Sequence, residues 1–374
     1  MVRTIGVITR QAEMVVGLPT DGLYSSGPSP DGPHPRHVVL SGGSSGIGLQ
    51  AAAQLLAAGH RLTVLCRDGA TAKRLADQLS GALTPVISDL ADLASVEAGA
   101  AALLAAGEPI DTLVLNAGLQ YSGARAPRWS AQGFELTLAV NHLAHQVLLQ
   151  RLLPLLLRGT APRLVVTASE VHDPTAAGGK VGKPAGLGEL AGLRQGPGAA
   201  MVDGGPFDAE KAYKDSKLCN VLMAREVERR LRERGTPLPV LAWSPGLVIP
   251  RGAGGFFRDN QRLNPLGQAV FAFIARDLLR VTESPERAGA LLAGLATNVP
   301  VEVGGFQYWS NRVLGPGRLR FAEAEPSADA RSDGLAAELW QLSARAVGVG
   351  ADAGLGAEDG LAAEAERERG HASP

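Results

Sequence analysis

HVVLSGGSSGIGLQAAA, residues 37–53, is the stretch that decides the fold of this 374-residue chain. An apolar run leads directly into three spaced glycines and then into a helical pattern. Gly42 permits a tight turn out of a strand, Gly46 lets backbone approach a pyrophosphate, and Gly48 lets the helix pack close to the sheet. A glycine triplet alone also fits an ordinary strand-to-helix turn, but a helix that ends at Gly59 and a second strand after it favour a dinucleotide site. The predicted cofactor loop comprises Ser41, Gly42, Ser44, Ser45, Gly46, Ile47 and Gly48.

Short apolar runs alternate with helical patterns along the rest of residues 36–349, which predicts one α/β domain with a Rossmann-type doubly wound parallel sheet. Ligands of such sheets bind at the carboxyl ends of the strands, where the strand order reverses. The predicted strands are 36–41, 61–66, 84–88, 111–115, 163–167, 239–243 and 305–310. The predicted helices are 48–58, 93–106, 131–157, 207–234 and 265–281.

The ends of the chain and its composition suggest no further chemistry. Residues 1–35 are interpreted as a leader or linker, and residues 350–374 as a low-complexity mobile tail. A net charge of −1 gives no electrostatic reason to expect nucleic acid. The two cysteines stand at no metal-like spacing, so neither a disulfide framework nor a metal site is expected. We expect a cytoplasmic protein whose membrane association is at most peripheral; an organelle and an oligomer both remain open.

The tip of the second predicted strand indicates which nicotinamide cofactor is bound. Arg67 lies 19 residues after Gly48, where NAD-binding proteins usually place a carboxylate for the ribose hydroxyls. A guanidinium at this position suits a 2′-phosphate, so NADPH is favoured, although Asp68 could serve the ribose instead. Further cofactor contacts are predicted at the ends of the next two strands, by Asp89 and Leu90 and by Asn116, Ala117 and Gly118.

A tyrosine and a lysine at helical spacing form the candidate catalytic pair. Tyr213 and Lys217 are four residues apart and therefore share one helix face. A nearby ammonium should lower the pKa of the phenol toward the working range, and Lys217 could also reach the cofactor ribose. Ser169 ends the fifth strand and could hold a substrate oxygen. Asn141 could open its helix locally and hold a water molecule that relays protons. A Tyr/Lys pair alone could also be a solvated helix face, and Ser169 and Asn141 could be polar residues satisfied within the fold.

Together with Ser244-Pro245-Gly246, these residues resemble the short-chain dehydrogenase/reductase superfamily. The resemblance implies a tetrad of Asn141, Ser169, Tyr213 and Lys217, a hydride from the nicotinamide, and cofactor contacts by Pro245 and Gly246.

A more specific resemblance rests on the spacing of Ser169 and Tyr213, which stand 44 positions apart, far more than is usual in that superfamily. The insertion ends in MVDGGPF (201–207) and leads into KAYKDSKLCN (211–220). With GFE at 133–135, YWS at 308–310 and LWQLS at 339–343, these motifs are similar to the light-dependent protochlorophyllide reductase family. That family reduces one double bond of a porphyrin-like pigment with NADPH as hydride donor, and the tyrosine is thought to supply the proton.

Several positions depart from the family pattern at places expected near the pigment. Leu247 replaces a cysteine, Ser244 a tyrosine, Pro250 a threonine, Gln146 a phenylalanine and Ala144 a glycine, whereas Tyr121 is retained.

Three alternatives follow: a protochlorophyllide reductase, a light-independent reductase of another bulky apolar carbonyl or enone, and a non-catalytic NADP-binding pigment carrier. The glycine-rich insertion, about 172–206, is expected to form a substrate loop or lid.

Overall fold

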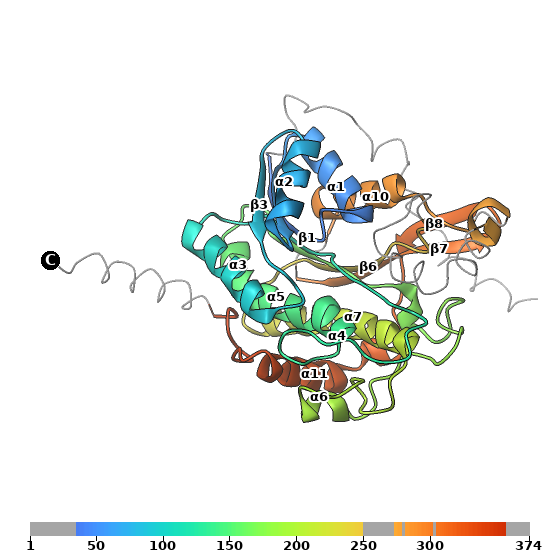
Figure 1. Ribbon diagram of the computed structural model, residues 1–374. Helices are drawn as coiled ribbons and strands as arrows, with labels where there is room; N and C mark the ends of the chain where they lie inside the picture. The colour runs from blue at the N-terminus through green and yellow to red at the C-terminus, as the bar shows by residue number, and fades with distance from the viewer. Residues whose placement is uncertain (1–34, 250–272, 279–280, 302–303, 357–374) are drawn as a thin grey trace, which may run out of the picture.

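The computed structural model describes residues 35–249, 273–278, 281–301 and 304–356, which form one eight-stranded sheet with helices on both faces (Figure 1). The strand order is β3-β2-β1-β4-β5-β6-β7-β8, and every neighbouring pair is parallel except β7 with β8. The order reverses between β1 and β4, which confirms the predicted doubly wound sheet. The strands are β1 His37–Ser41, β2 Arg61–Cys66, β3 Leu83–Ile87, β4 Thr112–Leu115, β5 Arg163–Thr167, β6 Val240–Ser244, β7 Phe306–Gly315 and β8 Arg318–Glu323.

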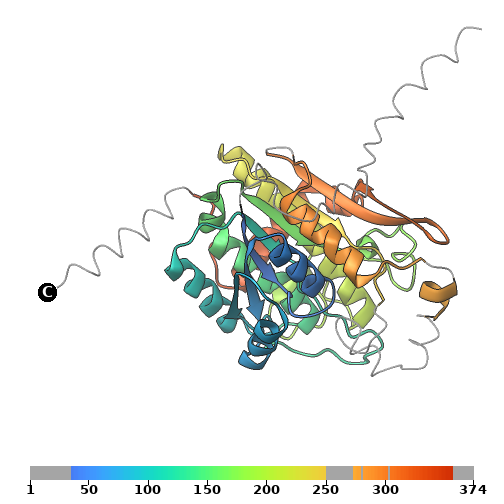
Figure 2. The same cartoon turned by 90° about the horizontal axis from the view of Figure 1, so that it is seen from above.

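Helices cover the two faces of the sheet because the strands are apolar on both sides. Val38 and Leu40 of β1 pack with α1 and α10, whereas Val39 between them packs with α3, α5 and α7. Figure 2 shows α1 and α10 side by side. The helices are α1 Gly46–Ala57, α2 Gly69–Gln78, α3 Leu93–Ala106, α4 Leu136–Leu138, α5 Ala144–Leu157, α6 Ala191–Gln195, α7 Ala209–Glu233, α10 Pro285–Thr297 and α11 Asp333–Ala346.

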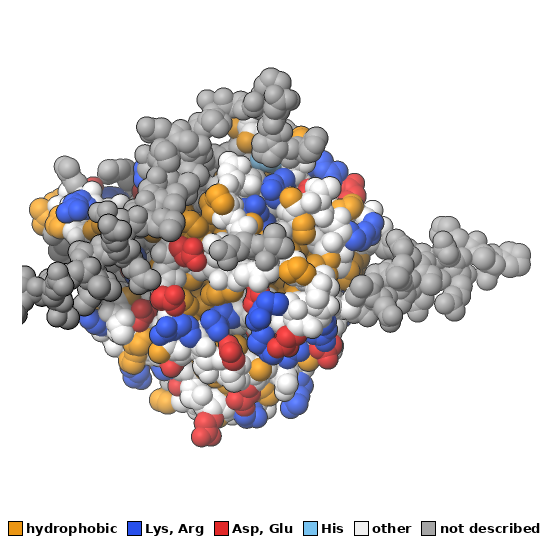
Figure 3. Space-filling view, turned by 180° about the vertical axis from the view of Figure 1, so that it is seen from behind, with side chains coloured by type: hydrophobic (Ala, Val, Ile, Leu, Met, Phe, Trp, Pro, Cys, Tyr) orange, Lys and Arg blue, Asp and Glu red, His pale blue; other side chains and the backbone are white. Residues whose placement is uncertain are grey.

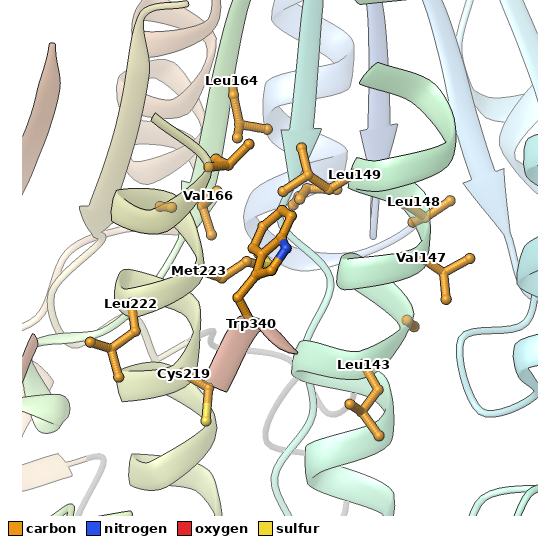
Figure 4. Packing of buried hydrophobic residues seen from close by; sticks show 14 of the residues in the cluster. Leu143, Val147, Leu148, Leu149, Leu164, Val166, Cys219, Leu222, Met223 and Trp340 are labelled. Atoms are coloured by element: carbon orange, nitrogen blue, oxygen red, sulfur yellow. The ribbon is translucent and has the colours of Figure 1, made fainter. Parts of the chain in front are cut away.

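The larger of the two hydrophobic clusters, which we call the main hydrophobic cluster, lies between the sheet and the layer of α5, α7 and α11. Trp340 of α11 inserts between Met223 of α7 and Leu149 of α5 (Figure 4). Its indole is 1% exposed, and its Nε1 donates to the carbonyl oxygen of Ala351 at 2.7 Å. This layer fixes α7, which carries the candidate catalytic pair.

The structure differs from the prediction in several elements, and helices α2, α6, α10 and α11 were not predicted. The helix predicted over 131–157 is divided into α4, a π-helix Ala139–Leu143 and α5. Strand β8 was not predicted, because its apolar residues alternate with charged ones on an exposed hairpin after a Gly-Pro-Gly turn. The helix predicted over 265–281 falls mostly outside the described residues; only Phe273–Leu278 is described, as a π-helix.

The domain continues past the boundary predicted at residue 349. Leu355 is 2% exposed in the main hydrophobic cluster, and Asp352 pairs with Arg230 of α7 and with Arg234 directly after it. The predicted tail therefore begins with packed chain, and the predicted leader lies outside the described residues except for Pro35. Within the described ranges no helix is both long and apolar enough to cross a bilayer. On the face seen in Figure 3, basic and acidic side chains are interspersed.

Candidate active site

The glycine loop between β1 and α1 turns sharply and leaves the start of α1 uncovered. Gly42 has a φ of +71°, and a Cβ there would lie 2.7 Å from the Cα of Ala117. Gly48 lies against the carbonyl oxygen of Gly42, which a Cβ would approach to 2.1 Å. At Gly46, by contrast, φ is +54° and a Cβ would meet nothing within 4 Å. Two glycines thus close the turn, and the third leaves open space above the start of α1, where Ser45 does not cap the helix.

The Ser41 side chain is buried beneath this loop and is hydrogen-bonded to the neighbouring loop after β4. This role differs from the cofactor contact that the sequence predicts for it. The side chain is 1% exposed, and its Oγ accepts from the backbone N–H groups of Asn116 at 2.9 Å and Ala117 at 3.0 Å. His145 Nδ1 lies 3.0 Å from the carbonyl oxygen of Asn141, so Nδ1 carries the proton, and Ser41 Oγ donates to Nε2 at 3.0 Å. One buried network therefore joins the ends of β1 and β4 to the helix that bears Asn141.

Arg67 and Asp68, the two polar side chains at the end of β2 that could bind the ribose end of the cofactor, are held in different ways. Asp68 accepts from Thr71 N at 2.7 Å and caps α2, which with the neighbouring Arg67 holds its pKa at about 2. Arg67 is exposed and donates to Asp68 at 3.1 Å. Asp68 is thus bound to the start of α2, and the Arg67 guanidinium paired with it lies exposed at the end of β2.

Asn141 lies in the π-helix Ala139–Leu143, so the predicted local opening of the helix is confirmed. Its side chain is buried and exchanges two hydrogen bonds with the backbone of Leu119, at 2.8 and 3.0 Å, and donates to Ser216 Oγ at 3.0 Å. A Cβ on Gly118 would lie 3.4 Å from both Asn141 Oδ1 and Lys217 Nζ. The loop after β4 therefore lies directly against both groups, and Asn141 and Lys217 are buried beneath it.

Tyr213, Ser169 and Lys217 converge at the carboxyl end of β5. The Tyr213 hydroxyl is hydrogen-bonded to Ser169, and Lys217 Nζ lies 5.7 Å from the centre of the Tyr213 ring and donates to the carbonyl oxygen of Thr167 at 3.0 Å. Burial raises the pKa of the phenol, an effect that the hydrogen bond to Ser169 opposes, and burial lowers the pKa of Lys217 to about 7. In the chain by itself desolvation dominates, so the pKa of Tyr213 lies above its ordinary value and not below it.

The remaining predicted cofactor residues lie along the same edge of the sheet. Asp89 turns the chain after β3 by accepting from Ala91 N at 3.0 Å, and Leu90 beside it packs against the main cluster. Gly246 has a φ of +75°, and a Cβ there would lie 2.7 Å from the carbonyl oxygen of Asn311; the side chain of Asn311 in turn donates to Pro245 O at 3.2 Å.

Most of the departures from the family pattern that the structure describes lie in the protein interior. Gln146 is fully buried and donates to Gln150, and Ala144 is also fully buried. Ser244 is fully buried, and its Oγ accepts from Glu170 N at 2.9 Å. The expectation that these three residues line a pigment pocket is therefore wrong for this conformation. Leu247 is half-buried, and Pro250 lies outside the described residues.

The retained Tyr121 is fully buried as well. Its hydroxyl donates to Glu135 at 2.5 Å and accepts from Arg128 N at 3.1 Å, while its ring stacks on Phe207 at 5.9 Å. Glu135 caps α4 through the N–H groups of residues 137 and 138. Tyr121 thus ties the loop after β4 to the helix that leads into Asn141.

Sequence reasoning missed His145, Thr167 and Lys214. His145 stands four residues after Asn141, a spacing that could have suggested contact. Thr167 supplies the carbonyl for Lys217, and its hydroxyl donates to Asn116 and accepts from Trp243 Nε1. Lys214 binds backbone of the insertion, which no sequence pattern reveals.

The sheet, the glycine loop and the group of Asn141, Ser169, Tyr213 and Lys217 define a short-chain dehydrogenase. The family model described as short chain dehydrogenase matches residues 36–180. Among solved structures, an uncharacterised protein from Mycobacterium paratuberculosis is 25% identical with a TM-score of 0.60, over 84% of this chain and 94% of that one. Pseudomonas aeruginosa RhlG, solved with NADP, has the same fold, with 24% identity and a TM-score of 0.52 over 73% of this chain and 94% of that one.

Curated relatives narrow the class. Protochlorophyllide reductase A of Oryza sativa subsp. japonica is 35% identical over 83% of this chain and 80% of that protein. The Avena sativa protochlorophyllide reductase is 34% identical over 83% of this chain and 99% of that protein, and the Chlamydomonas reinhardtii one is 32% identical over 84% and 78%. The chain belongs to the protochlorophyllide reductase family of short-chain dehydrogenases, and it is an oxidoreductase that uses a nicotinamide cofactor.

Proposed function

We propose that this chain uses NADPH to reduce one double bond of protochlorophyllide in a light-driven step of chlorophyll biosynthesis. The observation that carries the proposal is the assembly of Tyr213, Ser169, Lys217 and Asn141 at the carboxyl end of β5, beside an open phosphate loop. NADPH supplies the hydride when it is bound. Arg67 would hold its 2′-phosphate, and the backbone at Gly46 would face its pyrophosphate.

The chain's own residues would deliver the proton. Tyr213 carries it: the phenol is protonated at neutral pH, and burial raises its pKa further. The hydrogen bond to Ser169 fixes the direction of the hydroxyl, and Lys217 lies close enough to stabilise the phenolate that remains after transfer. Asn141 holds the loop after β4 in place through its two hydrogen bonds to the backbone of Leu119.

The proposal is tested by mixing the purified chain with NADPH and protochlorophyllide and comparing absorption spectra before and after illumination. We expect conversion only when NADPH and light are both present. Conversion in the dark would remove light from the account. No conversion of the pigment, together with NADPH oxidation by another bulky apolar enone or carbonyl, would establish the light-independent alternative.

A further inference from the structure

The insertion between Ser169 and Tyr213 consists of two parts that are held in different ways. From residue 185 onward its leucine side chains belong to the main hydrophobic cluster, with Leu187 2%, Leu190 0% and Leu193 4% exposed. This part is therefore core, and the expectation of a lid does not apply to it. Residues 178–183, which we call the arm, contribute no side chain to that cluster and are mostly exposed.

The arm is held at its backbone by one side chain of α7. Lys214 is 5% exposed, and its ammonium donates to the carbonyl oxygens of Gly179 at 3.0 Å, Lys183 at 2.9 Å and Val181. An ammonium has three N–H donors, so these three carbonyls satisfy it completely. Because a buried charge is tolerated only when it is satisfied in this way, the three carbonyls and the ammonium hold one another in place.

The arm touches the neighbours of both catalytic hydroxyls. Lys214 directly follows Tyr213 in the chain. At the other end, a Cβ on Gly178 would lie 3.1 Å from Val171 Cγ1 and 3.7 Å from Glu170 Oε1, and these two residues directly follow Ser169. Between these contacts the arm presents Val181, whose side chain is 66% exposed. Because the arm is held between the residue that follows Tyr213 and the two residues that follow Ser169, this exposed apolar side chain is available to an apolar ligand.

We propose that Lys214 is a positioning residue that sets the arm as one wall of the substrate site, with Val181 as its apolar contact. The inference rests on the proposed function for the identity of the substrate, but the position of the arm can be measured without substrate. Lys214 acts through the arm backbone and does not touch the reacting atoms.

The first experiment is tryptic cleavage at the Lys180–Val181 bond in the NADPH-bound chain. In Lys214→Ala we expect cleavage at least about tenfold faster than in the wild type, because the carbonyl cradle loses its cation. n-Propylammonium at tens of millimolar should restore protection, since three converging carbonyls accept a small ammonium, whereas tetramethylammonium, which has no N–H donor, should not. Lys183→Ala is the matched control. It removes an exposed ion pair with Asp208 from the same arm and should change cleavage by less than about twofold.

The second experiment measures steady-state kinetics with protochlorophyllide. Lys214→Ala should raise KM about tenfold, with kcat within about threefold and NADPH affinity within about twofold, and n-propylammonium should reverse the change in KM. Val181→Asp, a surface change that leaves folding intact, should raise KM similarly without faster cleavage.

Four results would overturn the inference: unchanged cleavage in Lys214→Ala, no rescue by the amine, equal loss of cofactor and substrate binding, or a normal KM in Val181→Asp. If Lys214→Ala does not fold, Val181→Asp decides alone. If the wild type does not convert protochlorophyllide, the proposed function fails. The rate of tryptic cleavage, with and without n-propylammonium, still decides the role of Lys214.

Discussion

The two halves of the carboxyl edge of the sheet are built by different means. At the ends of β1 and β4 local geometry sets the site, through the left-handed φ of Gly42 and Gly46 and through the N–H groups of Asn116 and Ala117, which donate to Ser41 Oγ. In the region beyond β5, the geometry depends on side chains that are distant in sequence from the backbone they hold. Lys214 holds the arm, and Leu190 is packed in the core. We call the region at the ends of β1, β2 and β4 the cofactor half and the region beyond β5 the substrate half. We therefore expect the cofactor half to tolerate changes in the insertion and the substrate half not to tolerate them.

The largest effect is expected at the catalytic pair. Tyr213→Phe should fold and bind NADPH normally but lose at least about two orders of magnitude in turnover, since it lacks the proton donor. Single-turnover conversion of protochlorophyllide measures this loss. Tyr121→Phe is the control: it removes a buried hydroxyl bonded to Glu135, costs about 1–2 kcal/mol of stability and leaves turnover within about threefold. Near-full activity of Tyr213→Phe would mean that the proton comes from elsewhere.

Next is a substitution that distinguishes the two parts of the insertion. Leu190 is fully buried, so Leu190→Ala should lower the free energy of unfolding by about 2–4 kcal/mol, whereas Val181→Ala on the arm should change it by less than about 0.5 kcal/mol. Urea unfolding measures both. Equal and small effects would show that the whole insertion is a surface excursion.

Arg67→Ala should affect only the cofactor half. It should weaken NADPH binding by roughly 1.5–3 kcal/mol, the contribution of a charged hydrogen bond, and leave NADH binding nearly unchanged. Calorimetry with both cofactors checks this. The control is Lys73→Ala, which removes an exposed charge on α2 that pairs with Asp77. An equal loss for NADPH and NADH would contradict the assignment of Arg67 to the 2′-phosphate.

The smallest effect concerns pH. Burial lowers the pKa of Lys217 from 10.5 to about 7, so the unfolded chain holds this proton more tightly than the folded one. The destabilisation by Lys217 is therefore complete below pH 7 and disappears as pH rises toward 10.5. Without cofactor, Lys217→Met should be more stable than wild type by about 1–3 kcal/mol at pH 6, and by clearly less at pH 9.5. A difference that does not change with pH would mean that Lys217 stays charged throughout.

The sequence alone predicts the cofactor half of the site well and the substrate half poorly. The positions of Gly42, Gly48 and Arg67 follow from a strand, a turn and a helix contiguous in the chain, so local rules predict them. Helical spacing likewise predicts the pairing of Tyr213 with Lys217. The contacts of Lys214 with residues 179–183 and the burial of Leu190 depend on how the insertion returns to α7, which no local pattern encodes. For the same reason, the positions that depart from the family were misplaced: Gln146 and Ser244 were assigned to a pocket, whereas the fold buries them.

The most direct test of the account follows the two hydrogens added to the pigment. The chain is illuminated with protochlorophyllide and NADPH that carries deuterium at the transferred position, and separately with ordinary NADPH in deuterated water. We predict one deuterium from NADPH on one carbon of the reduced double bond and one solvent deuterium on its neighbour, with Tyr213→Phe slowing only the solvent-derived step. A product without label from NADPH, or unchanged solvent incorporation in Tyr213→Phe, would contradict the account.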